Sequence, residues 1–392
     1  MKKITCSLLV VAVILGCSKW DMIRMTRIAV TKDVASAEQM AAEKAVGYAA
    51  DPKRLERDIK RFQDEFAKII QQFRDAVRTI WGRKEVKEPG PKEYVKYTQN
   101  YLSRASVDFD KGIISVETLD PKDPLASLKN AIVTTLLTPE DPRAVDLFSA
   151  RTVKLGEMPF LYGEVKDHEN IDIRWGWRAE RFADHLIANK LQIREIDIGE
   201  ASKTVRFVIF PMVSDHEQIR ARKYRLFVER FADQYAVSKN LVYAIMKTES
   251  DFNPYAVSKA PAFGLMQIVP ETAGRDVHLF LEKKDGLPSK TFLFKPENNI
   301  RYGVAYLYLL HYQYLKEIRN PVSREYCIIA AYNTGAGNVL RTFDADRDSA
   351  PGRINRLGPL EVYNTLRTKL PHDEARQYLI KVMNAKKDFV NF

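Results

Sequence analysis

The chain of 392 residues is long enough for two or three domains at about 150 residues each. Its hydrophobic fraction of 45% and charged fraction of 29% are those of a globular protein, which excludes wholesale disorder. Lys and Arg exceed Asp and Glu by 11, so we expect attraction to an anionic partner such as nucleic acid, an anionic membrane or an acidic wall polymer.

The N-terminus has the pattern of an export signal. Two lysines precede an apolar run at residues 8–15, which is too short for a bilayer-spanning helix of about 20 residues. Residues 14–17 (Ile-Leu-Gly-Cys) are similar to a bacterial lipobox, in which the cysteine becomes the lipidated first residue. By this resemblance, Ser18 favours the outer membrane. We therefore expect a signal peptide at 1–16 and a lipid anchor on Cys17 facing the periplasm, with a simple cleaved signal or a buried cysteine in a short helix as the alternatives.

The cysteines agree with this interpretation. Removal of residues 1–16 also removes Cys6, and Cys17 would carry lipid. Cys327 then has no partner, so the sequence predicts that no intrachain disulfide forms.

Three segments follow the signal. Residues 17–50 are small, polar and charged and are expected to be a lipidated tether. Residues 51–214 carry mixed helix and strand patterns, which predict a small α+β domain. Residues 215–392 carry only helical patterns, which predict an all-α domain.

The α+β segment begins with a 3.6-residue apolar repeat over 55–80, which predicts a long helix. Strand patterns at 105–109 and 113–117 flank Asp-Lys-Gly at 110–112, a good hairpin turn. The remaining elements expected here are helices at 125–137 and 178–191, strands at 193–198 and 205–213, and two possible strands on either side of 167–170. The helices expected in the all-α segment are 219–235, 241–250, 300–316, 325–332, 360–370 and 373–390.

Glu249 is the candidate catalytic acid. With Leu241 at zero and 100° per residue, Glu249 falls at about 80°, inside the apolar stripe of its helix. Burial without a cation raises a carboxyl pKa toward neutrality, which suits a general acid. Asp251 falls at about 280°, on the expected solvent face, so the two acids are not expected to act as a pair. The alternative is a helix-terminal Glu that reaches water.

The residues that follow Glu249 carry a family resemblance. Glu249-Ser250 precedes Asn-Pro-Tyr-Ala-Val-Ser at 253–258, Gly-Leu-Met-Gln at 264–267 and Ala-Tyr-Asn at 331–333. This combination resembles the lytic transglycosylases of the goose-type lysozyme superfamily. The segments 80–82, 92–97, 159–163 and 182–184 are similar to membrane-bound members of that family, so the resemblance covers about 340 residues and leaves out 19–50.

The resemblance implies a lysozyme-like all-α catalytic domain that cleaves the bond between N-acetylmuramic acid (MurNAc) and N-acetylglucosamine (GlcNAc) in peptidoglycan without water. The product is a 1,6-anhydromuramoyl end, and Glu249 acts as acid and then as base while the sugar's own N-acetyl group assists. A retaining hydrolase of the common kind needs a second carboxylate about 5 to 5.5 Å away. The sequence is consistent with a one-acid mechanism because Asp251 is expected to face away.

The resemblance also implies roles for five further residues. Ser258 would hydrogen-bond near Glu249, Gln267 would line the groove, and Tyr332 and Asn333 would hold acid and sugar in register. Tyr378 matches the family's late tyrosine near the catalytic acid, although a core aromatic is the alternative.

Other chemistries lack a motif in the sequence. There is no zinc-type His pair, no phosphate-binding glycine loop and no zinc-finger spacing, so we expect no metal, no cofactor and no nucleic acid. The expected partners are glycan strands and the outer membrane. Two other functions stay open: a hydrolytic goose-type muramidase, and a non-catalytic wall-binding scaffold lipoprotein. We expect the α+β domain to position the catalytic domain.

Overall fold

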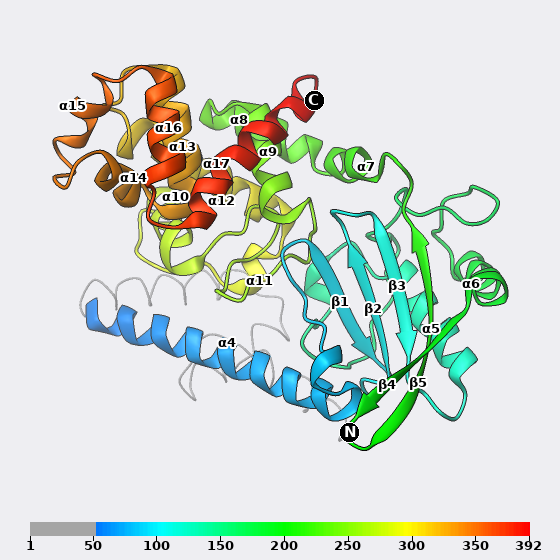
Figure 1. Cartoon of the computed structure of the whole chain (residues 1–392). Helices are drawn as coiled ribbons and strands as arrows, with labels where there is room; N and C mark the ends of the chain where they lie inside the picture. The colour runs from blue at the N-terminus through cyan, green and yellow to red at the C-terminus, as the bar shows by residue number, and fades with distance from the viewer. Residues whose placement is uncertain (1–51) are drawn as a thin grey trace.

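The structure of the protein, a computed structural model, describes residues 52–392, with side chains from residue 57 onward. The predicted signal peptide, the Cys17 lipid site and the whole predicted tether lie outside the described residues. A sheet-bearing part and a helical part lie next to each other, and the long helix α4 runs beneath both (Figure 1). No helix in the described part is long and apolar enough to cross a membrane.

Helix α4 (Pro52–Trp81) confirms the helix predicted at 55–80 and joins the two parts. Toward its C-terminal end, Phe73 packs edge-on against Tyr97 of the sheet with ring centroids 5.6 Å apart. Midway along the helix, Phe66 contacts Phe263 of the helical part with ring centroids 5.9 Å apart. The apolar stripe of α4 is therefore buried against both parts.

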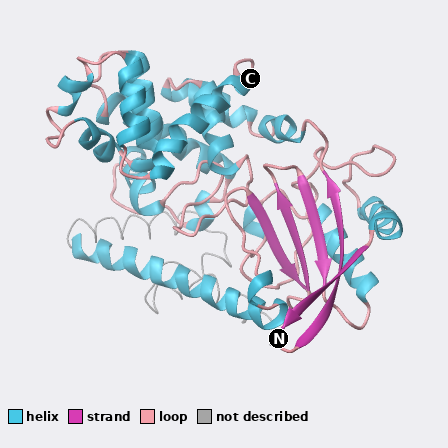
Figure 2. Ribbon diagram, in the orientation of Figure 1, coloured by secondary structure: helices cyan, strands magenta, loops and turns pink. Residues whose placement is uncertain are grey.

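Five antiparallel strands form one sheet in the order β1-β2-β3-β5-β4 (Figure 2). The strands are β1 (Glu93–Thr98), β2 (Ser103–Asp108), β3 (Ile113–Thr118), β4 (Gln192–Ile198) and β5 (Ala201–Pro211). The predicted hairpin is confirmed, with Asp108 opposite Ile113. Gly112 closes its turn at φ +63°, a conformation that favours glycine. The predicted strands beside 167–170 are wrong, because only an isolated bridge between Lys166 and Asp172 forms there.

Helices cover one face of the sheet and the end of α4 packs on the other. Helices α5 (Pro124–Leu136) and α6 (Gly176–Lys190) confirm the helices expected at 125–137 and 178–191, and α5 contacts β2 and β3. On the opposite face, the guanidinium of Arg104 lies 3.9 Å from the ring of Trp81 and bonds Glu117 at 2.5 Å. This ion pair lies in the domain interior, away from Glu249.

The helical part contains eleven α-helices within the described residues, α7 to α17. They are α7 (His216–Arg222), α8 (Arg225–Tyr235), α9 (Lys239–Ser250), α10 (Arg275–Glu282), α11 (Lys290–Leu293), α12 (Pro296–Leu309), α13 (Pro321–Thr334), α14 (Ala336–Phe343), α15 (Ala350–Ile354), α16 (Pro359–Lys369) and α17 (Asp373–Ala385). The single helix predicted at 219–235 is wrong. It breaks at Tyr224, which is buried, and Lys223 donates to the carbonyl of Phe160, so the chain turns to pack on the sheet part.

One cluster of buried apolar side chains continues from the sheet part into the helical part. Tyr255 packs against Tyr94 at 5.1 Å and against Phe160 at 5.3 Å, both in the sheet part. Its hydroxyl donates to the carbonyl oxygen of Pro139. The two parts are thus packed together where the loop after α9 meets the sheet.

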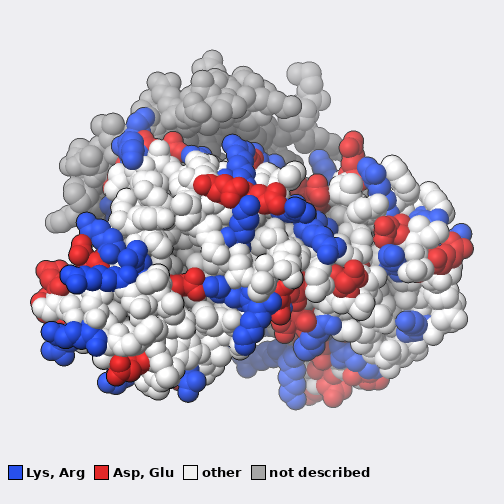
Figure 3. Space-filling view, turned by 90° about the horizontal axis from the view of Figure 1, so that it is seen from above, with Lys and Arg blue, Asp and Glu red and all other residues white. Residues whose placement is uncertain are grey.

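On the face of the molecule seen from above, basic and acidic side chains are interspersed (Figure 3).

Candidate active site

Helix α9 carries Glu249 one residue before its end. Ser238 caps the N-terminus by accepting a hydrogen bond from the Leu241 amide. The apolar stripe with Val242 and Ile245 is buried, and Glu249 is half-buried beside it. Glu249 is therefore held at the edge of the core.

The carboxylate of Glu249 has a neutral hydrogen-bond donor. The hydroxyl of Tyr378 on α17 donates to Oε1 of Glu249 over 2.7 Å, and Tyr378 is 5% exposed. Burial raises the pKa of Glu249 to about 7, while the Tyr378 hydrogen bond opposes that increase. The charge of Glu374 raises this pKa and that of Lys92 lowers it. A carboxyl group with this pKa can hold and release a proton near neutral pH.

Asp251 does not face solvent, which corrects the expectation from helical periodicity. The helix ends at Ser250, and Asp251 adopts a left-handed conformation with φ 52° that turns its side chain inward. It is 2% exposed and lies 3.6 Å from Nη2 of Arg220. Burial raises the pKa of Asp251 to about 6. Asp251 and Glu249 thus lie in different surroundings: Asp251 faces Arg220, and Glu249 faces Tyr378.

The Gly-Leu-Met-Gln loop at 264–267 is tied to Glu249's helix and to α12 and α13. The hydroxyl of Ser250 donates to the carbonyl of Leu265 over 2.7 Å, and that of Tyr332 donates to the carbonyl of Met266 over 2.9 Å. Asn299 Oδ1 accepts from the Met266 amide at 2.8 Å. Sequence reasoning missed Asn299, because it lies among polar residues in the first turn of α12 and nothing local indicates that it is buried.

Gly264 is required by this packing. Its φ is +73°, and a Cβ there would lie 2.5 Å from Nδ2 of Asn299. Gln267, also with positive φ, is half-buried and donates from Nε2 to the carbonyl of Gly264 over 2.8 Å. These contacts therefore fix the backbone conformation of the loop, and with it the position of Gln267.

Two of the predicted site residues make different contacts from those expected. The hydroxyl of Ser258 donates to the carbonyl of Ala260 and accepts from the Ala262 amide at 3.2 Å. The hydrogen bond near Glu249 that the resemblance implies for Ser258 is not formed. Asn333 follows Tyr332 on α13, is half-buried, and makes no side-chain hydrogen bond to the described part of the chain.

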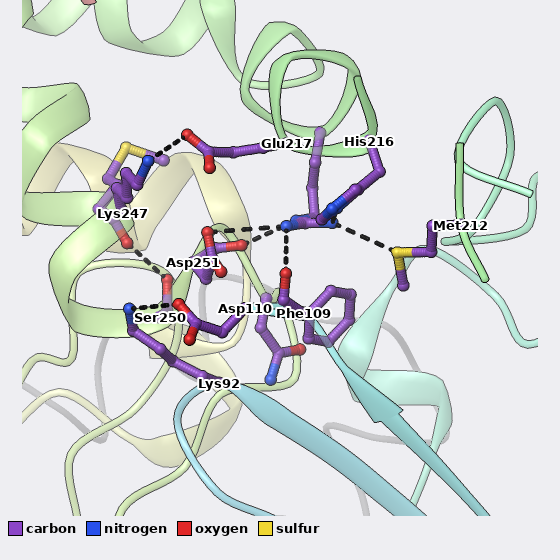
Figure 4. Close-up of polar contacts among 12 residues, drawn as sticks. Lys92, Phe109, Asp110, Met212, His216, Glu217, Lys247, Ser250 and Asp251 are labelled. Atoms are coloured by element: carbon purple, nitrogen blue, oxygen red, sulfur yellow. Dashed lines mark hydrogen bonds and ion pairs between the residues drawn. The ribbon is translucent and has the colours of Figure 1, made fainter. Parts of the chain in front are cut away.

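Arg220 of α7 connects the turn that follows Glu249 to the sheet part. Nε of the buried Arg220 donates to the carbonyl of Asp251 over 2.7 Å, and its Nη1 donates to Glu164 Oε2 over 2.6 Å. Its Nη2 donates to the carbonyl of Phe109 over 3.2 Å. Figure 4 shows Asp251 and Phe109 together with His216 around this contact. Arg220 thus ties the end of α9 to the sheet part.

Two family models match the chain. The model described as Membrane-bound lytic murein transglycosylase C, N-terminal domain, matches residues 55–223, and the Transglycosylase SLT domain matches residues 227–354. A protein of Yersinia pestis (strain Pestoides F) named Membrane-bound lytic murein transglycosylase C is 46% identical over 325 residues, 83% of this chain and 89% of that protein. This chain belongs to that family. The relative of the same name from Yersinia pseudotuberculosis serotype O:1b (strain IP 31758) has the same identity and coverage.

The two family domains meet between residues 223 and 227, at the break between α7 and α8. Arg220 therefore belongs to the N-terminal family domain, while Asp251 belongs to the transglycosylase domain. Among solved structures, the 70 kDa soluble lytic transglycosylase of Escherichia coli is 26% identical, with 43% of this chain and 24% of that chain covered at a TM-score of 0.33. Within the described residues, no three His, Cys, Asp or Glu side chains are placed to hold a metal ion.

Proposed function

We propose that this protein is a peptidoglycan lytic transglycosylase that cleaves the MurNAc-GlcNAc β-1,4 bond and leaves 1,6-anhydromuropeptides. The observation that carries the proposal is the environment of Glu249. Burial raises its pKa to about 7, and Tyr378 donates to its Oε1 at 2.7 Å. The family membership supports the same activity, because the relatives are named as lytic murein transglycosylases.

In the proposed reaction, protonated Glu249 donates its proton to the glycosidic oxygen as the bond from C1 of the muramoyl sugar to that oxygen breaks. The sugar's own N-acetyl oxygen stabilises the cationic C1. The C6 hydroxyl oxygen then bonds to C1, and the Glu249 carboxylate takes the hydroxyl proton. One residue acts as acid and then as base, and no water is consumed. The Tyr378 hydroxyl stabilises the carboxylate between these steps.

The surroundings of the neighbouring acids support this mechanism over ordinary retaining hydrolysis. That chemistry needs a second carboxylate beside the acid. Asp251 faces the buried Arg220, and Glu374 is exposed in the first turn of α17. Neither has the setting of a buried nucleophile next to the reacting sugar.

We assign substrate-binding roles to five residues around Glu249. Tyr378 would hold the acid in position, which its hydrogen bond to Glu249 supports. Tyr332 would hold the loop at 264–267 in position, which its hydrogen bond to the carbonyl of Met266 supports. Gln267 and Asn333 are half-buried and would face sugar hydroxyl and amide groups. Ser258 would have to release Ala260 before it reached substrate.

Product analysis tests the proposal. Purified sacculi are digested with the protein and the soluble fragments are identified by mass spectrometry. The proposal predicts fragments with 1,6-anhydro ends, and the Glu249→Gln variant should produce none above background. Reducing ends would instead indicate a muramidase. Binding to sacculi without any release of fragments would indicate a wall-binding scaffold.

We also propose that Cys17 carries a lipid anchor in the outer membrane, with residues 1–16 as signal peptide, 17–50 as tether, and the two folded domains at 51–214 and 215–392 in the periplasm. The lipobox-like residues 14–17 and the membrane-bound relatives support this. Several acyl chains anchor a protein stably, since each buried CH₂ contributes about 0.8 kcal/mol. The Cys17→Ala variant should leave the outer-membrane fraction. If mature variant protein stayed with outer membranes after a high-salt wash, the anchor would lie elsewhere.

A further inference from the structure

Lys92 is a basic residue of the sheet part at its contact with the loop that follows the candidate catalytic acid. It directly follows Pro91, whose carbonyl accepts a hydrogen bond from Nδ2 of Asn253 over 3.0 Å. That bond fixes the start of β1 against the loop after Glu249. The Lys92 ammonium lowers the pKa of both Glu249 and Asp251, as expected for a cation near both carboxylates.

The ammonium group of Lys92 has N–H donors that are available to a ligand. Its nearest carboxylate is Asp110, with Nζ 3.7 Å from Oδ1, which is longer than a hydrogen bond (Figure 4). Its Nζ donates no hydrogen bond to the described part of the chain, and the side chain is 37% exposed. By contrast, Lys223 and Lys247 at the same junction donate to carboxylates at 2.6 Å and 2.7 Å.

We propose that Lys92 is a substrate-binding residue that takes a carboxylate carried by the 3-O substituent of the muramoyl sugar. This inference rests on the proposed function, because it concerns the substrate of the same site. The GlcNAc unit of peptidoglycan is neutral. The muramoyl unit carries a lactyl group whose carboxyl is either free or joined to a stem peptide with carboxylates of its own. A lysine ammonium recognises such a group as a compact point charge.

The position of Lys92 gives the sheet part a direct role in substrate recognition. The Asn253 bond and the Asp110 contact come from opposite sides of the domain junction and hold the segment before β1 in place. Substrate anchored there would run across the junction, with its scissile bond at Glu249. Selectivity for muramoyl over unsubstituted sugars would then come partly from a residue outside the transglycosylase domain, which matches residues 227–354.

The test measures binding without turnover, in the full-length chain with the Glu249→Gln background. Calorimetry at low salt compares three fragments of equal length: a glycan bearing stem peptides, a stem-free glycan with free lactyl carboxylates, and a neutral chitooligosaccharide. Adding Lys92→Gln should weaken carboxylate-dependent binding roughly 10-fold, and Lys92→Arg should restore part of it. Lys129→Gln, which breaks a surface pair with Asp184, is the matched control.

The three fragments separate the outcomes. If Lys92→Gln weakens binding of the stem-bearing glycan alone, Lys92 binds a carboxylate of the stem peptide. If it weakens binding of the stem-free glycan alone, Lys92 binds the lactyl carboxylate. Either result supports the proposal. Equal weakening of chitooligosaccharide binding, or no weakening at all, overturns it. Failure of the proposed function would show separately, as wild-type protein that releases no anhydro fragments.

Discussion

The Tyr378 hydroxyl on α17 and Oε1 of Glu249 on α9 are joined by a 2.7 Å hydrogen bond across 129 residues of sequence. Because Glu249 must start protonated and its pKa is raised to about 7, the rate should fall as the pH rises above about 7. Tyr378 lowers that pKa, so Tyr378→Phe should move the fall to higher pH. It should also reduce kcat about 10-fold, since the carboxylate loses a donor worth about 1.5 kcal/mol.

Tyr243 provides the matched control for this pH profile. Tyr243 lies on α9, the helix that carries Glu249, and it is buried. Its hydroxyl has no hydrogen-bond partner in the described part of the chain. Tyr243→Phe should therefore leave the pH profile of kcat/KM unchanged. An identical shift in both variants would mean that Tyr378 acts through packing alone.

The three acids near the site should respond differently to neutralisation. Glu249→Gln should reduce kcat/KM on sacculi at least 10²-fold, the usual minimum for a general acid or base. Asp251→Asn and Glu374→Gln should each remain within about 5-fold of wild type, because neither carboxylate enters the reaction. A loss in either control variant comparable to that of Glu249→Gln would reveal a two-carboxylate mechanism.

Arg220 links the N-terminal domain to the turn after Glu249, so its loss should destabilise the protein and impair activity together. Arg220→Met leaves the buried Glu164 with Lys223 alone and should cost about 3 to 5 kcal/mol in unfolding free energy. Denaturant unfolding measures this cost. Pairing it with Glu164→Leu should recover part of the stability, since the buried Glu164 charge is then removed together with Arg220, while Asp251 still loses its contact with Arg220.

A surface ion pair provides the comparison for Arg220. Lys129→Met breaks the exposed contact with Asp184 and should cost under about 1 kcal/mol. An Arg220→Met variant as stable as Lys129→Met would show that the interdomain contact contributes little to the fold.

Gly264→Ala tests whether the loop at 264–267 needs a glycine at this position to keep its backbone conformation. Its positive φ and the 2.5 Å approach to Asn299 Nδ2 predict a loss of about 1 to 3 kcal/mol in stability and a lower kcat. Gly176→Ala is the control, because a Cβ there meets nothing within 4 Å at the start of α6. Thermal melting and sacculus digestion measure both variants. Equal effects at the two positions would contradict the packing account.

Local patterns in the sequence predict much of this fold. The 3.6-residue repeat of α4 and the Asp-Lys-Gly turn between β2 and β3 are short-range signals, and both elements form as expected. The place of Glu249 in the apolar stripe also predicts its raised pKa, because burial is the dominant cause.

Contacts between distant segments limit what the sequence predicts. Asp251 is buried because a left-handed residue ends α9 and Arg220 meets it there, and neither fact follows from helical periodicity. The break at Tyr224 likewise depends on packing against the sheet part. Lys92 and Asn299 were not identified as site residues from the sequence, because each reaches the site from another element.

The central claim is that Glu249 serves as acid and base without water entering the product. Digesting sacculi in water enriched in oxygen-18 tests this most directly, with mass spectrometry of the released muramoyl ends. The account predicts anhydro ends that lack the label and are one water lighter than reducing ends. Reducing ends carrying oxygen-18 at C1 would contradict it, because they require water as the nucleophile.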